Sequence, residues 1–197
     1  MSLSTAQLET AKQLVGYLSP PLPLNSAIAV CGNVGQECAF NPSLAGDGGA
    51  SKYWMQWTGS RLTAYQSWCT NNGVSPTDPK AIQFFNYELP MPDGAPLIVP
   101  WLMDTSNGGQ PSRSLATLTA DICQFYERAG TPALDNRISY ATQVATFLSA
   151  NPIPGTPTPT PTTPPAPVAN IAVIEAQITD AMTILSSALA QLKGTTS

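Results

Sequence analysis

The sequence predicts a mostly helical α+β domain with one small β-hairpin, followed by a proline-rich linker and a last helix. Apolar residues recur at helical spacing over much of residues 1–151. Within that region, Gly46-Asp-Gly-Gly49 is a turn signal of the kind that joins two short strands. Residues 152–168 are dominated by proline and threonine and cannot form a packed core. We therefore expect one domain of about 150 residues, with the remaining chain outside it.

Prolines mark the ends of the first two helices. A helix over about residues 6–18 ends at the run Pro20-Pro-Leu-Pro23. A second helix over about residues 25–39 is terminated by the Asn41-Pro42 step. Further helical stretches are predicted at about residues 61–72, 78–89, 95–104, 114–129 and 135–150.

Two glycines, Gly32 and Gly35, lie inside the second predicted helix. Each costs about 1 kcal/mol relative to alanine at such a position. They either let another element approach closely or open room for a substrate. We favour the close approach.

The charge balance limits the class of partner. Only 10% of the residues are charged, and the formal net charge is −4. Nucleic acid and anionic membrane surfaces bind basic patches, so neither is an expected partner, whereas a neutral ligand such as carbohydrate fits. The N-terminus shows no signal-peptide pattern, and polar residues interrupt every apolar stretch, so we expect no membrane-spanning helix.

The chain has four cysteines and no histidine. The cysteines form no CxxC pair, so a zinc site lacks its ligands, and we expect no metal and no other cofactor. Cys31 and Cys38 lie about 10 Å apart along one helix, too far for a disulfide. We expect small buried thiols, as in a protein made in the cytoplasm, while a bridge between Cys69 and Cys123 stays open.

Glu37 is the leading catalytic candidate. It lies at the edge of the apolar second helix, close to where that helix ends. Burial and the negative end of the helix dipole both disfavour a charged carboxyl, so we expect Glu37 to hold a proton near neutral pH. A general acid requires such a proton, and without histidine a carboxyl is the natural acid–base group.

A second carboxyl and an aromatic segment follow Glu37. Asp47, in the glycine turn, could activate water or stabilise an oxocarbenium ion, although aspartate is also a common turn residue and we favour that role. The segment from Tyr53 to Arg61 combines rings that stack on sugars with polar groups that bond hydroxyl or acetamido groups, and it forms either core or the wall of a cleft. Its candidate substrate contacts are Tyr53, Trp54, Gln56, Trp57, Thr58 and Arg61.

Four other acids are expected mostly at surface or structural positions. They are Glu88, Asp93, Asp104 and Glu127, of which Glu127 is a candidate to pair with Arg128 or Arg137.

The end of the chain predicts a spacer and an association helix. Residues 152–168 form an extended polyproline-like linker that spans up to roughly 50 Å at ~3.1 Å per residue. The region 169–197 contains a helix, over about residues 169–193, whose apolar heptad stripe predicts a short coiled coil. Such a helix has no core of its own, so through residues 169–192 it binds its own copies or another protein, or it packs back onto the first domain. The stripe consists of Ile171, Ile174, Ile178, Ala181, Leu185, Ala188 and Leu192.

Several segments, in order, resemble the phage tail lysozyme family, a group of virion-associated peptidoglycan hydrolases. The resemblance covers roughly residues 5–150. The first and third of its segments together are fairly specific, and the others support them. These segments are Gly32-Asn33…Gln36-Glu37-x-x-Phe40-Asn41-Pro42, Gly46-Asp47-Gly48-Gly49, Gln56-Trp57-Thr58-Gly59-Ser60-Arg61, Gln83-Phe84-Phe85-x-x-Glu88-Leu89 and Phe125-Tyr126-Glu127-Arg128.

The resemblance implies a lysozyme-like domain over residues 1–151, with a sugar cleft between a glutamate-bearing helix and a small sheet. It places Glu37 at the position of the family's catalytic acid and Gln56 on the cleft wall. Tyr126 and Glu127 are the remaining candidate substrate contacts. The implied reaction is cleavage of the β-1,4 bond between N-acetylmuramic acid and N-acetylglucosamine in the peptidoglycan glycan strand. The implied setting is a virion or tail protein that is made in the host cytoplasm and opens the cell wall during infection.

Two alternatives stay open. A lytic transglycosylase would use the same glutamate and release a 1,6-anhydro sugar. A non-catalytic structural or wall-binding virion protein is favoured by Lys52-Tyr53, where the family commonly has Tyr-Gly, and by the predicted association helix.

Overall fold

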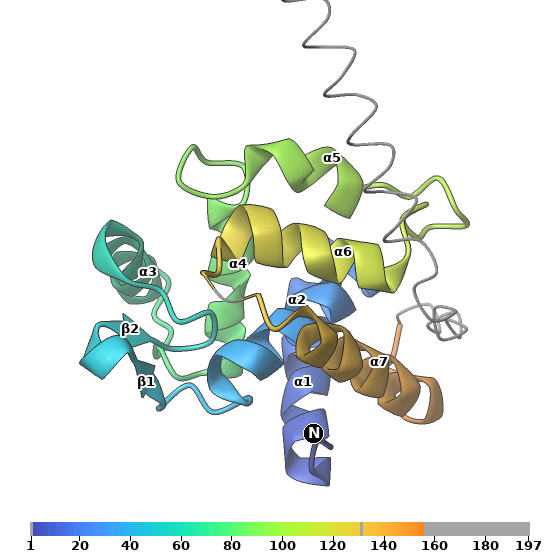
Figure 1. Cartoon of the computed structure of the whole chain (residues 1–197), viewed down its shortest axis with the longest axis horizontal. Coiled ribbons are helices and arrows are strands. Elements are labelled where there is room, and N and C mark those ends of the chain that lie inside the picture. The colour runs from blue at the N-terminus through green and yellow to red at the C-terminus, as the bar shows by residue number, and fades with distance from the viewer. Residues whose placement is uncertain (1, 131, 156–197) are drawn as a thin grey trace, which may run out of the picture. The chain divides into compact units, whose positions relative to one another are not determined.

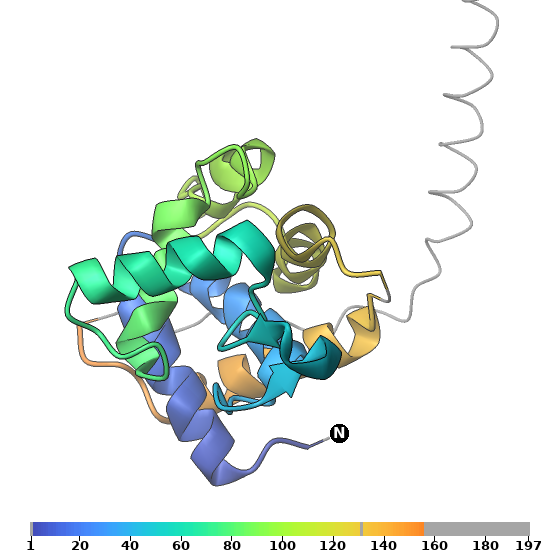
Figure 2. The same cartoon turned by 90° about the vertical axis from the view of Figure 1, so that its left-hand side faces the viewer.

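A central helix, α2 (Leu24–Cys38), carries the core of the computed structural model. Almost all of its side chains are buried. Helices α1 (Thr5–Leu18), α6 (Leu115–Asp121) and α7 (Leu134–Ala150) pack against it, and Figures 1 and 2 show α7 running past it. These four helices surround one part of the core, and the hairpin and α3 (Gly59–Asn71) lie on one side of them (Figure 1).

The two glycines of α2 allow the close approach of α7. A Cβ atom on Gly32 would lie 2.6 Å from the carbonyl oxygen of Arg137 and 2.8 Å from the Cβ of Ala141. On Gly35 it would lie 2.9 Å from the ring of Tyr140. Since real Cβ contacts are not that short, only glycine fits, and the predicted close approach is confirmed.

The predicted hairpin is present and very short. Strands β1 (Ala45–Gly46) and β2 (Ser51–Lys52) pair antiparallel and are joined by the 3-10 turn η1 (Asp47–Gly49). Within this connection Gly48 has φ 65° and Gly49 has φ 99°, values that glycine adopts without a steric penalty. The glycine cluster therefore turns the chain as the sequence predicts.

Three of the predicted helices are broken into shorter pieces. The stretch 78–89 is a 3-10 turn, η2 (Pro79–Gln83), followed by α4 (Phe84–Glu88). The stretch 95–104 is η3 (Pro96–Ile98) followed by α5 (Val99–Leu102). Prolines at the starts of η2, η3 and α5 supply no amide hydrogen, which favours short turns over one long helix. After α6 the chain continues as a π-helical turn, η4 (Ile122–Glu127).

The structure describes residues 2–130 and 132–155. Their apolar side chains form one core cluster, and no helix among them is long and apolar enough to cross a membrane. In the same residues no group of three or more metal-binding side chains could hold an ion. All four cysteines are buried and free, so the bridge between Cys69 and Cys123 is not formed. Most of the predicted linker and the whole association helix lie outside the described residues.

Candidate active site

Glu37 lies in the last turn of α2, next to the hairpin side of the fold. Its side chain is 18% exposed, and its Oε1 accepts a hydrogen bond of 2.6 Å from Nη2 of Arg137. The Arg137 side chain, from the first turns of α7, is only 2% exposed. The close packing of α7 on Gly32 therefore brings a buried positive charge directly to the candidate acid.

Arg137 is held in place on several sides. Its Nη1 donates to Oδ1 of Asn33 at 3.0 Å, and its Nε donates to the carbonyl oxygen of Pro132 at 2.7 Å. Asn33 in turn donates to the carbonyl oxygens of Ala29 and Thr119. These contacts hold the guanidinium against the carboxyl of Glu37, so Arg137 is its charged partner.

Glu127 contributes a second carboxyl to this region, from the end of η4. Its Oε1 is buried and has no hydrogen-bond partner among residues 2–130 and 132–155. Burial, followed by the negative charge of Glu37, raises the pKa of Glu127 well above its usual range, whereas Arg137 and Arg61 act in the opposite direction. The neutral form of Glu127 is therefore favoured, and it forms none of the ion pairs found among the described residues. The expected pairing with Arg128 or Arg137 is wrong, because Arg137 pairs with Glu37.

Asp47 and Gln56 both take part in the hairpin. Asp47 is exposed, and its Oδ2 accepts a hydrogen bond of 2.6 Å from the hydroxyl of Ser51. No hydrogen bond or ion pair in the described part of the chain joins Asp47 to Glu37. The Gln56 amide accepts from the backbone N–H of Gly46 and donates to the carbonyl oxygens of Leu44 and Tyr53. Its polar atoms thus hold the hairpin together.

The two tryptophans of the aromatic segment belong to the core. Trp54 and Trp57 are each 1% exposed, so neither presents a ring face to a sugar, and their expected place on a cleft wall is wrong. The ring of Trp57 stacks on Tyr65 with centroids 4.1 Å apart, and the indole of Trp54 donates to the carbonyl oxygen of Asp78. Trp57 also packs edge-on against Phe84 of α4, so its ring contacts both α3 and α4.

The other residues of that segment have mixed surroundings. Tyr53 is partly buried against Tyr65, and Thr58 is an exposed residue that precedes α3. Arg61 donates two hydrogen bonds to the carboxylate of Glu88, at 2.9 and 2.8 Å.

Tyr126 and Glu88 complete a buried polar network. The Tyr126 hydroxyl donates to Glu88 and accepts from the indole of Trp57, and the guanidinium of Arg61 lies 4.3 Å from the centre of the Tyr126 ring. Tyr126 is fully buried, so the expectation that it touches substrate is wrong. Glu88 is structural, as the sequence predicts.

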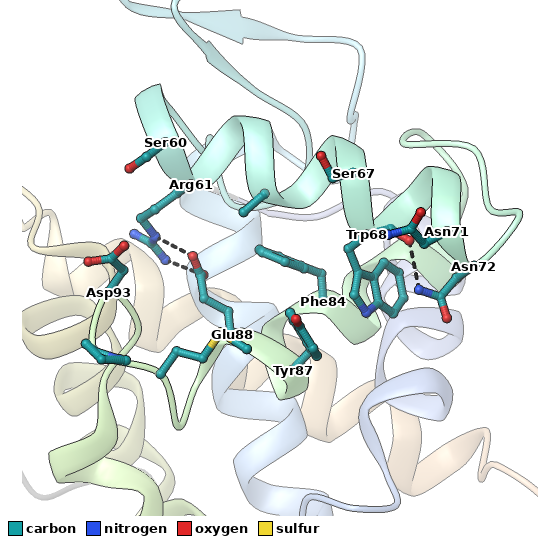
Figure 3. Close-up of a pocket in the computed structure, with 13 residues that line it drawn as sticks. Ser60, Arg61, Ser67, Trp68, Asn71, Asn72, Phe84, Tyr87, Glu88 and Asp93 are labelled. Atoms are coloured by element: carbon teal, nitrogen blue, oxygen red, sulfur yellow. Dashed lines mark hydrogen bonds and ion pairs between the residues drawn. The ribbon is translucent and has the colours of Figure 1, made fainter.

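A cavity of about 660 Å³ lies between α3 and α4 (Figure 3). Glu88 and Arg61 lie at one end of it, and Trp68 and Asn71 lie at the other. Glu37 is not among the residues that line it.

Sequence reasoning missed the partner of Glu37. Arg137 lies 100 residues further along the chain, and nothing in its neighbourhood distinguishes it from other surface-type arginines. Asn33, its second partner, is one of the residues on which the family resemblance depends.

Comparison with known proteins identifies one family. No curated protein shows significant sequence similarity to the chain. The sequence model of one family, phage tail lysozyme, matches residues 20–148, which include Glu37, the hairpin, the Arg61–Glu88 network and Arg137. With a mostly helical lysozyme-like α+β fold and a family match over most of its length, the chain belongs to the phage tail lysozyme family.

Proposed function

We propose that the protein is a muramidase in which Glu37 protonates the glycosidic oxygen between N-acetylmuramic acid and N-acetylglucosamine. Membership of the family suggests glycoside hydrolase activity on peptidoglycan. The observation that carries the proposal is the position of Glu37, a partly exposed carboxyl at the end of a buried helix and beside a small hairpin. A proton donor must reach the substrate from a fixed direction, and the buried Arg137 fixes this carboxyl.

A second carboxyl, Glu127, interacts with the charge of Glu37. The negative charge of Glu37 raises the pKa of Glu127, so the two carboxyls are not independent. Arg137 compensates one negative charge, and the second carboxyl is favoured in its neutral form.

The positive charge that develops on the sugar requires a second group. Asp47, a water molecule or the acetamido group of the substrate can each meet it. One oxygen of Asp47 already accepts a hydrogen bond from Ser51, which leaves Oδ1 for water or sugar. Asp47 is one candidate for this second role. Inversion at the anomeric carbon would indicate direct attack by water, whereas retention is expected both for Asp47 as nucleophile and for the acetamido group.

The family further suggests a phage-associated protein that acts on the bacterial cell wall. We propose that the virion carries it and that it opens the wall locally during genome entry. In this proposal residues 169–192 attach the enzyme to the particle or assemble its copies, and the linker supplies reach.

The test is a clearing assay on purified peptidoglycan with the wild type, Glu37→Gln and Glu9→Gln. Glu9 is an exposed carboxyl on α1 and serves as the matched control. Glu37→Gln is expected to lose at least about 100-fold in rate, because a general acid contributes 10²–10⁴-fold. The melting temperatures of all three proteins are compared, since the substitution also removes the charge that faces Arg137.

Two outcomes would reject the muramidase. Equal rates for the wild type and Glu37→Gln would remove Glu37 from the chemistry. No clearing by the folded wild type would favour a non-catalytic wall-binding protein, for which the ion pair of Glu37 with Arg137 is the supporting observation, since it gives Glu37 a structural partner. Mass spectrometry of the released sugars separates hydrolysis from 1,6-anhydro formation by the mass of one water.

A further inference from the structure

The cavity between α3 and α4 has the dimensions of a ligand site. Its volume of about 660 Å³ lies within the range of about 300–1,000 Å³ that is typical of small-molecule pockets. One wall comes from α3 and the other from α4 and the turn that follows it (Figure 3). We call this cavity the α3–α4 groove.

Aromatic rings form the floor and one side of the groove. The ring of Phe84 lies between Trp68 and Tyr87, with centroid separations of 6.1 and 5.8 Å. Phe84 is buried, whereas Tyr87 is 50% exposed. Figure 3 shows Trp68 and Tyr87 beside Phe84 in the middle and at one end of the groove. Tyr87 thus presents an apolar ring and a hydroxyl to whatever occupies the groove.

Uncharged polar groups line the rim of the groove. The side chains of Ser60, Ser67 and Asn71 make no hydrogen bond among the described residues, and all three are exposed. Asn72 donates to the carbonyl oxygen of Trp68, which leaves its own amide oxygen as an acceptor. Hydroxyl and amide groups beside aromatic faces match the hydroxyl and acetamido groups of an N-acetylated sugar.

The charges in the groove favour a neutral ligand. Arg61 and Glu88 form a two-fold hydrogen-bonded ion pair at one end, so they compensate each other. Asp93 is the remaining charged residue of the lining, and it would repel an anion. The groove lining therefore offers a phosphate group no unpaired cation. An uncharged amino-sugar chain needs no such cation.

The Arg61 end of the groove lies next to the candidate active site. Nη1 of Arg61 donates to the carbonyl oxygen of Tyr126 at 3.2 Å, and the next residue is Glu127. The positive charge of Arg61 acts to lower the pKa of Glu127, in opposition to burial, so the two side chains interact electrostatically. A glycan strand is a polymer, and a segment of it that leaves Glu37 on this side can reach the groove.

We infer that the α3–α4 groove is a second glycan-binding site, which holds a segment of the strand away from the bond that is cleaved, with Tyr87 as its main platform. The inference rests on the proposed function, because it assigns the same substrate to a second surface. Binding that is equally strong in the ground state and the transition state lowers KM for long strands and leaves kcat unchanged, and we assign binding of this kind to the groove.

The binding test uses the full chain with Glu37→Gln, which prevents degradation of the probe. Tyr87→Ala, Tyr87→Phe and Tyr17→Ala are each added to this background. Tyr17 is a half-exposed tyrosine on α1, outside the groove, and serves as the matched control. Sedimentation with purified peptidoglycan and titration with soluble N-acetylglucosamine oligomers measure the dissociation constants, and melting temperatures confirm that each variant is folded.

Tyr87→Ala is expected to weaken binding of both probes about 5- to 10-fold, the change that loss of one aromatic contact produces. Tyr87→Phe keeps the ring and is expected to retain most of the affinity, and Tyr17→Ala is expected to leave it unchanged. Equal affinities for Tyr87→Ala and Tyr17→Ala would overturn the inference.

A kinetic test uses the chain with its native Glu37. Tyr87→Ala is expected to raise KM several-fold on long strands, to leave kcat unchanged and to have no effect on short fragments. A drop in kcat on fragments would place Tyr87 at the cleaved bond and overturn the inference. If the wild type shows no turnover, the proposed function fails, and the binding test still decides whether the groove binds glycan.

Discussion

Arg137 and Glu127 are ionisable neighbours of Glu37. The guanidinium of Arg137 is 2.6 Å from Glu37, and the negative charge of Glu37 raises the pKa of Glu127. The buried Oε1 of Glu127 accepts no hydrogen bond among the described residues, so no hydrogen bond offsets the cost of charging it there. The site therefore contains one cation and two carboxyls whose charges interact.

The raised pKa of Glu127 predicts how the stability of the fold depends on pH. The pKa of Glu127 is raised well above its ordinary value of 4.5 in the folded protein. The folded state then binds more protons than the unfolded state, so this contribution is present below pH 4.5 and is lost as the pH rises through the folded pKa. Glu127→Gln cannot ionise, so this variant does not lose stability in that way. The difference between its unfolding free energy and that of the wild type is expected to increase from pH 4.5 to pH 8. Urea denaturation at several pH values measures it, and a difference that stays constant over this range would contradict the prediction.

The residues of the site differ in how far the sequence identifies them. Glu37 follows from its place at the edge of an apolar helix and from the family motif. Trp54 and Trp57 cannot be assigned in the same way, because aromatic residues beside polar ones occur both in clefts and in cores, and here they are buried. Arg137 is missed because its role depends on a contact between residues 100 positions apart.

At the scale of elements, the contact between α2 and α7 fixes the geometry of the site. Gly32→Ala would place a methyl group 2.6 Å from the backbone oxygen of Arg137, which cannot move as a flexible side chain does. Overpacking costs about 1–3 kcal/mol, which exceeds the gain in helix propensity of about 1 kcal/mol, so we expect a net loss of stability. Activity is expected to fall as well, because α7 carries Arg137.

Gly16→Ala is the matched control for this prediction. Gly16 lies inside α1, and the nearest heavy atom to an added Cβ is 4.0 Å away. This variant is expected to gain about 0.5–1 kcal/mol. Thermal unfolding of both variants measures the two effects, and changes of the same sign would show that helix propensity alone governs both positions.

Long elements are predicted better than short ones. Helices α1, α2, α3 and α7 lie within a few residues of their predicted bounds, because apolar spacing over several turns and flanking prolines define them. The stretches 78–89 and 95–104 are divided into 3-10 and α-helical pieces, since Pro79, Pro96 and Pro100 interrupt amide donation. The positions of these segments can be predicted from the sequence. Whether each residue is 3-10 or α-helical depends on packing in the folded protein.

At the scale of the molecule, the described residues form a core of their own. Among residues 2–130 and 132–155, the apolar residues that form or contact the core cluster lie between Leu3 and Ile153. Deleting residues 169–197 is therefore expected to leave the melting temperature and the rate on isolated cell wall largely unchanged. If the predicted helix associates, the mass in light scattering or the incorporation into particles falls. Unchanged mass together with normal incorporation would reject the assigned role of residues 169–192.

The α3–α4 groove shows what sequence reasoning leaves out at this scale. Its residues come from two helices that are separated by a turn, and no local pattern sets Tyr87 or Asn71 apart from other surface positions. Only the packing of α3 against α4 brings them to one surface.

The pairing of Glu37 with an arginine from α7 also orders events during synthesis. A nascent chain that has emerged only as far as the hairpin already contains Glu37, but it lacks the cation that holds this carboxyl in place. Arg137 follows Glu37 by 100 residues, so the pair can form only after that much more of the chain has been made. Incomplete or proteolytically shortened chains that end before Arg137 would therefore lack the fixed carboxyl that the proposed activity requires, and we expect them to be inert.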